Sequence, residues 1–103
     1  MGYILIYVTC PNKNSAKKIA KELLEEKLIA CANIANIDSM YSWKGKVEES
    51  KEVLLLAKTR SSLFKKIKKR ILDLHSYEVP CIISLPIIKG NKEYLEWIKK
   101  TTS

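Results

Sequence analysis

Apolar residues recur along this chain with the period of a β-strand in some segments and that of an α-helix in others. Each change of period marks the boundary of a predicted element. Residues 3–10 (YILIYVTC) form an apolar, β-branched run of strand length that Pro11 closes. Asn14 or Ser15 is then expected to cap a helix whose polar face carries lysine and glutamate. The apolar positions of this helix are Ala16, Ile19, Ala20, Leu23, Leu24 and Leu28. This part of the sequence predicts a strand followed by a helix that packs on a sheet.

Two strand-like runs follow, and a turn signal separates them. Residues 31–43 (CANIANIDSMYSW) and residues 46–60 (KVEESKEVLLLAKTR) flank the dipeptide Lys44-Gly45. A glycine between two such runs is typical of a β-hairpin, which here has a Lys-Gly tip.

The rest of the chain predicts a helix, a strand and a short helix. Ser61 or Ser62 is expected to cap the first of these. Its apolar stripe is Leu63, Phe64, Ile67, Ile71 and Leu74, and the other faces carry Lys65, Lys66, Lys68, Lys69 and Arg70. Residues 81–88 (CIISLPII) form the fourth strand, where Pro86 favours an edge or a bulge position. Asn91 can cap the last helix, which carries Tyr94, Leu95, Trp97 and Ile98.

This order of elements is βαββαβ with a C-terminal helix. Two βαβ crossovers linked by a hairpin predict an α+β fold, the ferredoxin-like sandwich, with an extended β-hairpin. Residues 1–103 are expected to form one domain, because no repeat or flexible linker divides them. All the helices are expected to cover one face of a four-stranded antiparallel sheet.

The predicted hairpin is longer than the helix that should cover it. An arm of this length reaches about 40 Å at about 3.3 Å per residue, whereas the first helix covers about 21 Å. The distal part therefore overhangs, and it carries Met40, Tyr41 and Trp43. A bend could fold it back over the same domain, but docking on another subunit is favoured, because an uncovered apolar edge promotes association. These three residues are the predicted subunit interface.

Charge and cysteine content narrow the class of protein. The chain has 103 residues, a net charge of +8 and an apolar fraction of 47%, which together indicate a globular domain suited to an acidic partner or with solvated lysine faces. Its three cysteines, Cys10, Cys31 and Cys81, form no CxxC pair. They favour a reducing, cytoplasmic location. The N-terminal apolar run is too short to span a membrane.

Metal-binding chemistry is concentrated in residues 75–81 (HSYEVPC), which hold the only histidine, His75, and Cys81. Both ligands must lie about 2.0–2.3 Å from a shared ion, but an extended stretch of this length spans about 20 Å. They can share an ion only if the chain turns or a second subunit supplies a ligand. Alternatively, His75 ends a helix and Cys81 is a small buried residue.

Enzymatic and nucleic-acid functions find little support. The sequence contains no glycine-rich loop, paired-carboxylate signature or HExxH motif, so no enzyme is predicted. RNA-recognition modules share this topology, but their aromatic residues on central strands are missing here. Lys58, Arg60 and the basic second helix could instead hold an anionic metabolite between subunits.

Several short motifs, in this order and spacing, give the chain a specific resemblance. They are TCP at 9–11, LIACAN at 28–33, SMYSWKGKVEESKE at 39–52, KT at 58–59, HSYEVP at 75–80 and YLEWI at 94–98. Over essentially its whole length the chain resembles the CutA family, the divalent-cation tolerance proteins. The resemblance implies a ferredoxin-like subunit, a tight homotrimer similar to the PII signalling proteins, and binding of copper and other divalent ions. It implies no enzymatic activity and no obligatory cofactor.

Two positions depart from the family pattern. Family members commonly read HPYEVPE, so Ser76 stands where they have proline and Cys81 stands where they have glutamate. The resemblance makes His75 and the residue at position 81 candidate metal ligands. A thiolate at Cys81 shifts the preference toward softer ions such as Cu(I) or Zn²⁺.

The leading hypothesis is therefore a non-catalytic CutA-like homotrimer that binds copper, zinc or other divalent ions and takes part in the response to them. The alternative is a PII-like trimeric sensor that binds an anionic small metabolite at Lys58 and Arg60. Neither a nucleic acid nor a membrane is expected as a partner.

Overall fold

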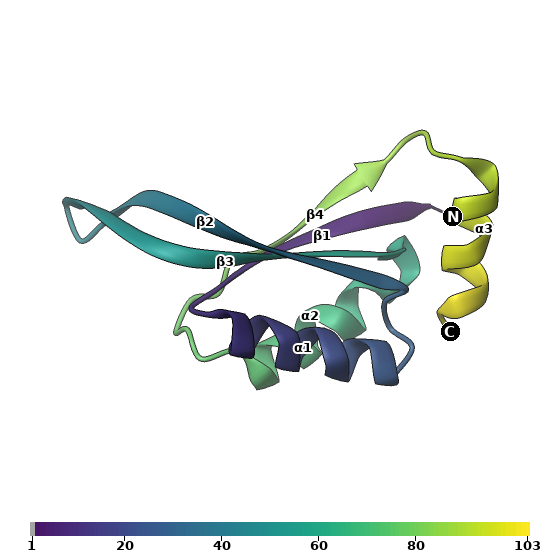
Figure 1. The fold of residues 1–103 in the computed structure, drawn as a ribbon, viewed down its shortest axis with the longest axis horizontal. Helices are drawn as coiled ribbons and strands as arrows, with labels where there is room; N and C mark the ends of the chain where they lie inside the picture. The colour runs from purple at the N-terminus through teal and green to yellow at the C-terminus, as the bar shows by residue number, and fades with distance from the viewer. Residues whose placement is uncertain (1) are drawn as a thin grey trace.

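The fold is a four-stranded antiparallel sheet with two helices on one face and a third across its end (Figure 1). The computed structural model describes residues 2–103, so Met1 of the predicted domain lies outside it. The strands are β1 (Tyr3–Cys10), β2 (Cys31–Trp43), β3 (Lys46–Arg60) and β4 (Ile82–Ile87), in the order β2-β3-β1-β4. The helices are α1 (Lys13–Glu25), α2 (Phe64–Leu74) and α3 (Lys92–Thr101), with a 3₁₀ turn, η1, at Ser61–Leu63. The α+β, ferredoxin-like prediction is confirmed.

The hydrophobic core lies between the sheet and the helices α1 and α2. Alternation along β1 buries Ile4, Ile6, Val8 and Cys10 on this face, as the period of a half-buried strand requires. The helices supply the facing side chains, which include Ile19, Leu23, Ile67 and Ile71. The buried Thr59 hydroxyl donates a 2.6 Å hydrogen bond to the Leu28 carbonyl, which ties β3 to the loop after α1.

The helix starts differ in part from the predicted ones. Asn12, not Asn14 or Ser15, caps α1, and its side chain accepts a hydrogen bond from the Ser15 amide at 2.8 Å. Neither Ser61 nor Ser62 caps α2 with its side chain, because both lie in the 3₁₀ turn that precedes the helix. The predicted Asn91 cap of α3 is confirmed by its bond to the Glu93 amide.

The position of α3 corrects the prediction that all helices cover one face. Figure 1 shows α3 standing across the end of the sheet, apart from α1 and α2. The Nζ atom of Lys58, whose side chain lies on the face opposite α1 and α2, is 5.6 Å from the ring centroid of Tyr94 in α3. Arg60 adds hydrogen bonds to Thr102, just after α3. The amphipathic pattern of α3 fixes its apolar stripe but not the surface on which it packs.

The hairpin overhangs the sheet, as its length predicts. Strand β1 pairs with β3 only from Val53 to Arg60, so residues 37–43 and 46–52 pair only with each other. We call this two-stranded extension the distal ribbon, and Figure 1 shows it projecting from the body of the molecule. The molecule measures 44 Å along its longest axis. Lys44 and Gly45 both have positive φ angles, 49° and 77°, which suits the tight turn at its tip.

The sheet face opposite α1 and α2 is apolar and uncovered by these helices. The register places Leu5, Leu54 and Leu56 on this face together with Ile83 and Leu85 of β4. Ile83 is 50% exposed and Leu85 is 44% exposed, although both lie in strands. We call these five residues the open face. Pro86 lies in β4, which pairs with β1 alone and is an edge strand, as predicted.

Candidate functional site

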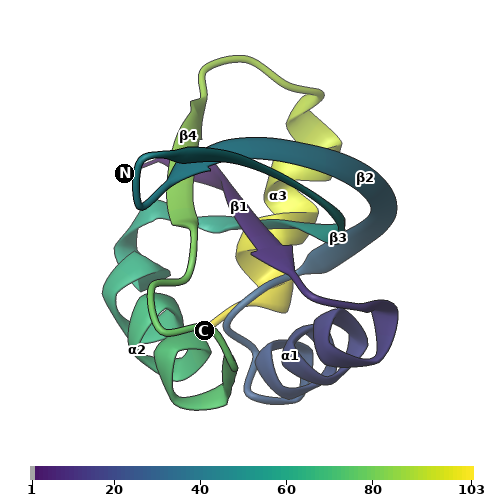
Figure 2. The same cartoon turned by 90° about the vertical axis from the view of Figure 1, so that its left-hand side faces the viewer.

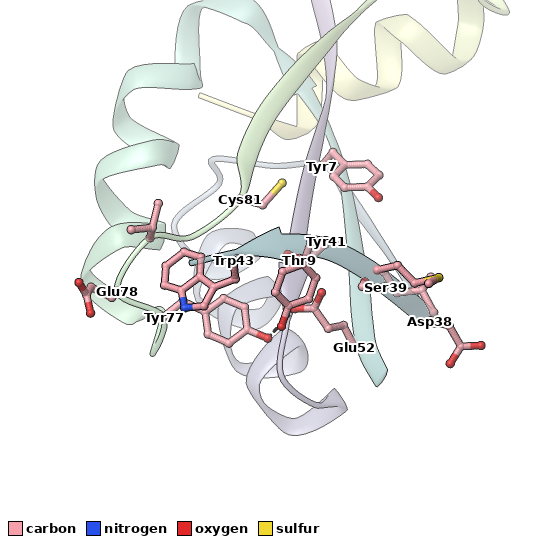
Figure 3. Close-up of a pocket in the computed structure, with 13 residues that line it drawn as sticks. Tyr7, Thr9, Asp38, Ser39, Tyr41, Trp43, Glu52, Tyr77, Glu78 and Cys81 are labelled. Atoms are coloured by element: carbon pink, nitrogen blue, oxygen red, sulfur yellow. Dashed lines mark hydrogen bonds between the residues drawn. The ribbon is translucent and has the colours of Figure 1, made fainter. Parts of the chain in front are cut away.

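The candidate site is a groove between the distal ribbon and the loop that joins α2 to β4, and its lining residues are drawn in Figure 3. Figure 2 looks at the end of the molecule where the distal ribbon and this loop both lie. It has a volume of about 750 Å³. Its acidic side chains are Asp38, Glu52 and Glu78, and its aromatic ones are Tyr7, Tyr41, Trp43 and Tyr77. Cys81 also lines it. Among the described residues that line this acidic groove, none is lysine or arginine, although the chain carries 19 of them.

His75 forms one support of the groove rather than part of its lining. Its Nε2 atom lies 2.8 Å from the carbonyl oxygen of Thr9, and its Nδ1 atom lies 3.1 Å from the amide nitrogen of Tyr77. A carbonyl accepts and an amide donates, so Nε2 carries the proton and Nδ1 accepts. Both ring nitrogens of the neutral imidazole are therefore engaged. A metal ion on His75 would have to displace one of these two bonds.

Tyr77 connects the loop to the hairpin. Its hydroxyl donates a 2.5 Å hydrogen bond to a carboxylate oxygen of Glu52 on β3, drawn as a dashed line in Figure 3. Burial, and then the bond to Glu52, raise the pKa of Tyr77, because both disfavour a phenolate. The ring of Tyr77 also lies beside that of His75, with centroids 4.7 Å apart. The loop is thus attached at Thr9 and at Glu52.

Cys81 offers the groove its only thiol among the described residues. The side chain is half-buried and free of a disulfide. Figure 3 shows it apart from Glu52 and Glu78. Within residues 2–103, no three histidine, cysteine, aspartate or glutamate side chains lie close enough together to hold a metal ion. The two predicted ligands lie in different places. The His75 ring contacts the Thr9 carbonyl of β1, whereas Cys81 lines the groove.

Cys10 is not a donor for the groove. Its side chain is fully buried in the core between the sheet and the helices α1 and α2. Burial, with a smaller contribution from the charge of Glu52, raises the pKa of the Cys10 thiol to about 11. A thiol with so high a pKa stays protonated at neutral pH and is a poor ligand.

The predicted interface residues are exposed on the distal ribbon. Met40 is 69% exposed, and Tyr41 and Trp43 are each nearly half exposed. Tyr41 and Trp43 also line the groove, so the distal ribbon carries residues of both the predicted interface and the candidate site. The Lys44 ammonium lies 5.9 Å from the centroid of the Trp43 ring.

The predicted anion-binding residues, Lys58 and Arg60, lie outside the groove, and both side chains already contact the C-terminal segment. Lys58 lies over Tyr94, as described above. Arg60 donates from Nε to the Thr102 hydroxyl at 2.9 Å and from an Nη atom to the Thr102 carbonyl at 3.2 Å. Both side chains hold the C-terminal segment against β3.

Sequence reasoning did not assign roles to Thr9, Glu52 and Tyr77. Thr9 contributes a main-chain carbonyl, for which a sequence has no side-chain signal. Tyr77 lies in the HSYEVP motif and Glu52 in an acidic stretch. Their residue types alone are compatible with a hydrogen bond from the tyrosine hydroxyl to the carboxylate.

Comparison with known proteins shows which family model and which proteins this chain is similar to. Residues 4–101 match the family model described as CutA1 divalent ion tolerance protein. The divalent-cation tolerance protein CutA of Thermus thermophilus is 46% identical over 99 residues, which cover 95% of this chain and 96% of that protein. The human protein CutA is 46% identical over 97 residues, which cover 93% of this chain but 54% of the human protein.

Solved structures with the same fold are also similar in sequence. CutA1 from Oryza sativa superposes with a TM-score of 0.96 at 45% identity, covering 100% of this chain and 95% of that chain. The structure described as the periplasmic divalent cation tolerance protein CutA from Archaeoglobus fulgidus has a TM-score of 0.94 at 44% identity, covering 96% and 97%. In the present chain, no helix among residues 2–103 is long and apolar enough to cross a membrane.

Proposed function

Because this chain belongs to the CutA family of divalent-cation tolerance proteins, we propose that it is a non-catalytic homotrimer that binds divalent metal ions and takes part in the response to them. Copper and zinc are the ions that we expect the protein to bind. No nucleic acid and no membrane enters the proposal as a partner. Three cysteines without a disulfide support a reducing, cytoplasmic location.

One observation carries the metal-binding part: a thiol lines a groove that has three carboxylates and no basic side chain among its described lining residues. Thiolate suits Cu(I) and Zn²⁺, and carboxylate oxygens accept a wide range of divalent ions. One subunit does not gather three such donors within residues 2–103. An ion bound through Cys81 therefore takes its remaining ligands from a neighbouring subunit or from water.

Two surfaces support the assembly. The distal ribbon has unpaired edges and exposes Met40, Tyr41 and Trp43, and the open face exposes Ile83 and Leu85. Large apolar surfaces of this kind associate in water. A head-to-tail contact between ribbon and neighbour must close into a ring or continue as a fibre, and a three-membered ring lets the open faces meet.

His75 contributes to metal binding by one of two routes. It becomes a ligand if an ion displaces the Tyr77 amide or the Thr9 carbonyl from a ring nitrogen. Otherwise it positions the loop that carries Cys81. Under either route, His75→Ala weakens the binding of divalent ions.

The alternative, an anionic metabolite at Lys58 and Arg60, has less support. Both side chains already interact with α3 or with Thr102. An anion there would have to displace the C-terminal segment, and no observation favours that exchange.

Isothermal titration calorimetry with copper, zinc, nickel and manganese tests the proposal. We expect Cys81→Ser to weaken the binding of copper and zinc more than that of nickel and manganese, because the thiolate prefers softer ions. Cys31→Ser is the matched control, since Cys31 is also a half-buried free thiol but does not line the groove. Equal losses for all four ions, or none, would show that Cys81 is not a ligand.

A further inference from the structure

We propose that the outer face of α2 is a docking surface for an acidic protein segment that carries an apolar side chain among its carboxylates. Four exposed residues at helical spacing define this surface, which we call the α2 stripe: Lys65, Lys68, Lys69 and Leu72. A protein partner goes beyond the metal ions of the proposed function, and its binding requires no ion.

The α2 stripe stays accessible in the proposed trimer. None of its residues lies on the distal ribbon or on the open face, which are the two surfaces proposed to meet other subunits. Helix α2 packs on the opposite side of the sheet, and Figure 2 shows it at the outer side of the molecule beside α1. A partner therefore reaches the stripe of each subunit without separating the trimer.

The charge of α2 is not balanced within the subunit. The helix has five basic residues and one acidic residue, Asp73. Within residues 2–103, Arg70 is the only one of the five that forms an ion pair, with Glu22 and Glu26. The four that form none in this range are Lys65, Lys66, Lys68 and Lys69. This local excess of positive charge is complementary to a partner with several carboxylates.

The same charges destabilise α2 in the isolated subunit. Lys65 lies three residues before Lys68 and four before Lys69, and like charges at these spacings disfavour a helix. Lys65 and Lys66 also lie in the first turn, which has no acidic side chain and where the helix dipole disfavours a cation. Local rules broken without a gain inside the subunit are expected at a functional surface. An acidic partner offsets both effects.

Leu72 adds an apolar contact point to the basic stripe. Its side chain is 48% exposed, whereas Ile67 and Ile71 of the same helix are fully buried. Leu72 follows Lys68 by four residues and Lys69 by three, so all three lie on one side of the helix. An apolar side chain of the partner can pack on Leu72 while flanking carboxylates meet the two lysines.

The exposed leucine also favours one class of acidic partner over the others. A phosphate backbone is bound through charge and gains nothing from Leu72. An anionic membrane takes up a helix through a broad apolar face, and Leu72 is a single residue. The α2 stripe therefore fits an acidic protein segment better than a nucleic acid or a lipid surface.

Fluorescence anisotropy of a labelled peptide, titrated with the assembled protein in buffer containing EDTA, tests the proposal. The probe is a peptide of about 14 residues, made of glutamate with leucine at every third or fourth position. The comparison peptide has serine in place of each leucine and therefore the same charge. We expect the leucine peptide to bind at least about tenfold more tightly, because only its side chains gain from burial against Leu72.

A matched pair of double variants tests the charge. Lys68→Gln with Lys69→Gln is compared with Lys18→Gln with Lys21→Gln, which removes the same charge from exposed lysines of α1. We expect about a tenfold loss of affinity for the leucine peptide in the α2 variant and at most about a twofold loss in the α1 variant. Circular dichroism should show the native spectrum for both.

A second pair tests the apolar contact. Leu72→Ser is compared with Leu24→Ser on α1, because Leu24 is 41% exposed and lies outside the α2 stripe. We expect Leu72→Ser to bind the leucine peptide about as weakly as the wild-type protein binds the serine peptide. Leu24→Ser should bind the leucine peptide as the wild-type protein does.

Three results would overturn the proposal. Absence of peptide binding would show that the lysines form only a solvated face. Equal affinity for the two peptides, or equal losses in the α1 and α2 variants, would show attraction without a defined site. Tighter binding of single-stranded RNA or of phosphatidylserine vesicles at the same salt concentration would assign the surface to another class of partner. Metal binding is tested separately by calorimetry, because EDTA removes metal ions from the peptide experiment.

Discussion

The imidazole Nε2 of His75 lies 2.8 Å from the carbonyl oxygen of Thr9, and this hydrogen bond joins the end of α2 to the end of β1 across 66 positions of the chain. On the other side of the ring, Nδ1 accepts the amide of Tyr77. The only histidine thus fixes the start of the loop that walls the acidic groove. Its two bonds require one neutral tautomer.

His75→Ala should destabilise the protein while leaving its fold intact. The substitution leaves the Thr9 carbonyl and the Tyr77 amide without their partner, at a cost of about 1–3 kcal/mol in the free energy of unfolding. Urea denaturation followed by far-UV circular dichroism measures the change. His75→Gln, whose side-chain amide can still donate to Thr9, should recover part of it. Unchanged stability in His75→Ala would contradict the role of His75 as a link.

Alkaline pH should destabilise the protein through Cys10. Burial raises the pKa of the folded-state thiol from 9.0 to about 11. The unfolded chain therefore releases this proton first, and stability present below pH 9 is lost as the pH rises to 11. The loss should reach about 2–3 kcal/mol over this range. The raised pKa of Tyr77 acts in the same direction from about pH 10 upward, where a tyrosine in the unfolded chain begins to ionise.

Cys10→Ala isolates this effect. The variant loses core volume at every pH, so only the slope of stability against pH is compared. Its slope between pH 9 and pH 11 should be clearly smaller than that of the wild-type protein. Parallel slopes would show that Cys10 does not carry the pH dependence.

Leu85→Asp should break up the proposed trimer. Leu85 lies on the open face and is 44% exposed in one subunit, and the proposed three-membered ring buries it against a neighbour. A buried, unpaired carboxylate at an interface is strongly unfavourable. Leu72→Asp on α2 is the matched control, because Leu72 is 48% exposed but lies on the other side of the molecule. Sedimentation velocity should show smaller particles for Leu85→Asp alone; identical profiles for both variants would contradict the interface.

Prediction from the sequence was most accurate for structure that depends on residues close together in the chain. The hairpin strands begin and end at the predicted residues, because alternation and the Lys44-Gly45 turn are encoded side by side. The cap of α1 was misplaced because Asn12, Asn14 and Ser15 are all competent caps, and the backbone decides among them.

Contacts between distant segments could not be read from patterns. The helical period of α3 does not reveal that Tyr94 meets Lys58 at the end of the sheet. Similarly, the residue types of His75 and Cys81 indicated metal chemistry, but the orientation of His75 depends on the Thr9 carbonyl, which has no side-chain signature. The acidic groove arises only when the hairpin and the loop are folded together.

Native mass spectrometry of the protein with stoichiometric Zn²⁺ or Cu(I) tests the central claim most directly, because it measures assembly and metal content together. We predict a particle of three times the 11.8 kDa subunit mass that carries bound ions, and a Cys81→Ser particle of the same size that carries fewer. A monomer at low micromolar concentration, or a Cys81→Ser trimer that retains its full complement of ions, would contradict the account.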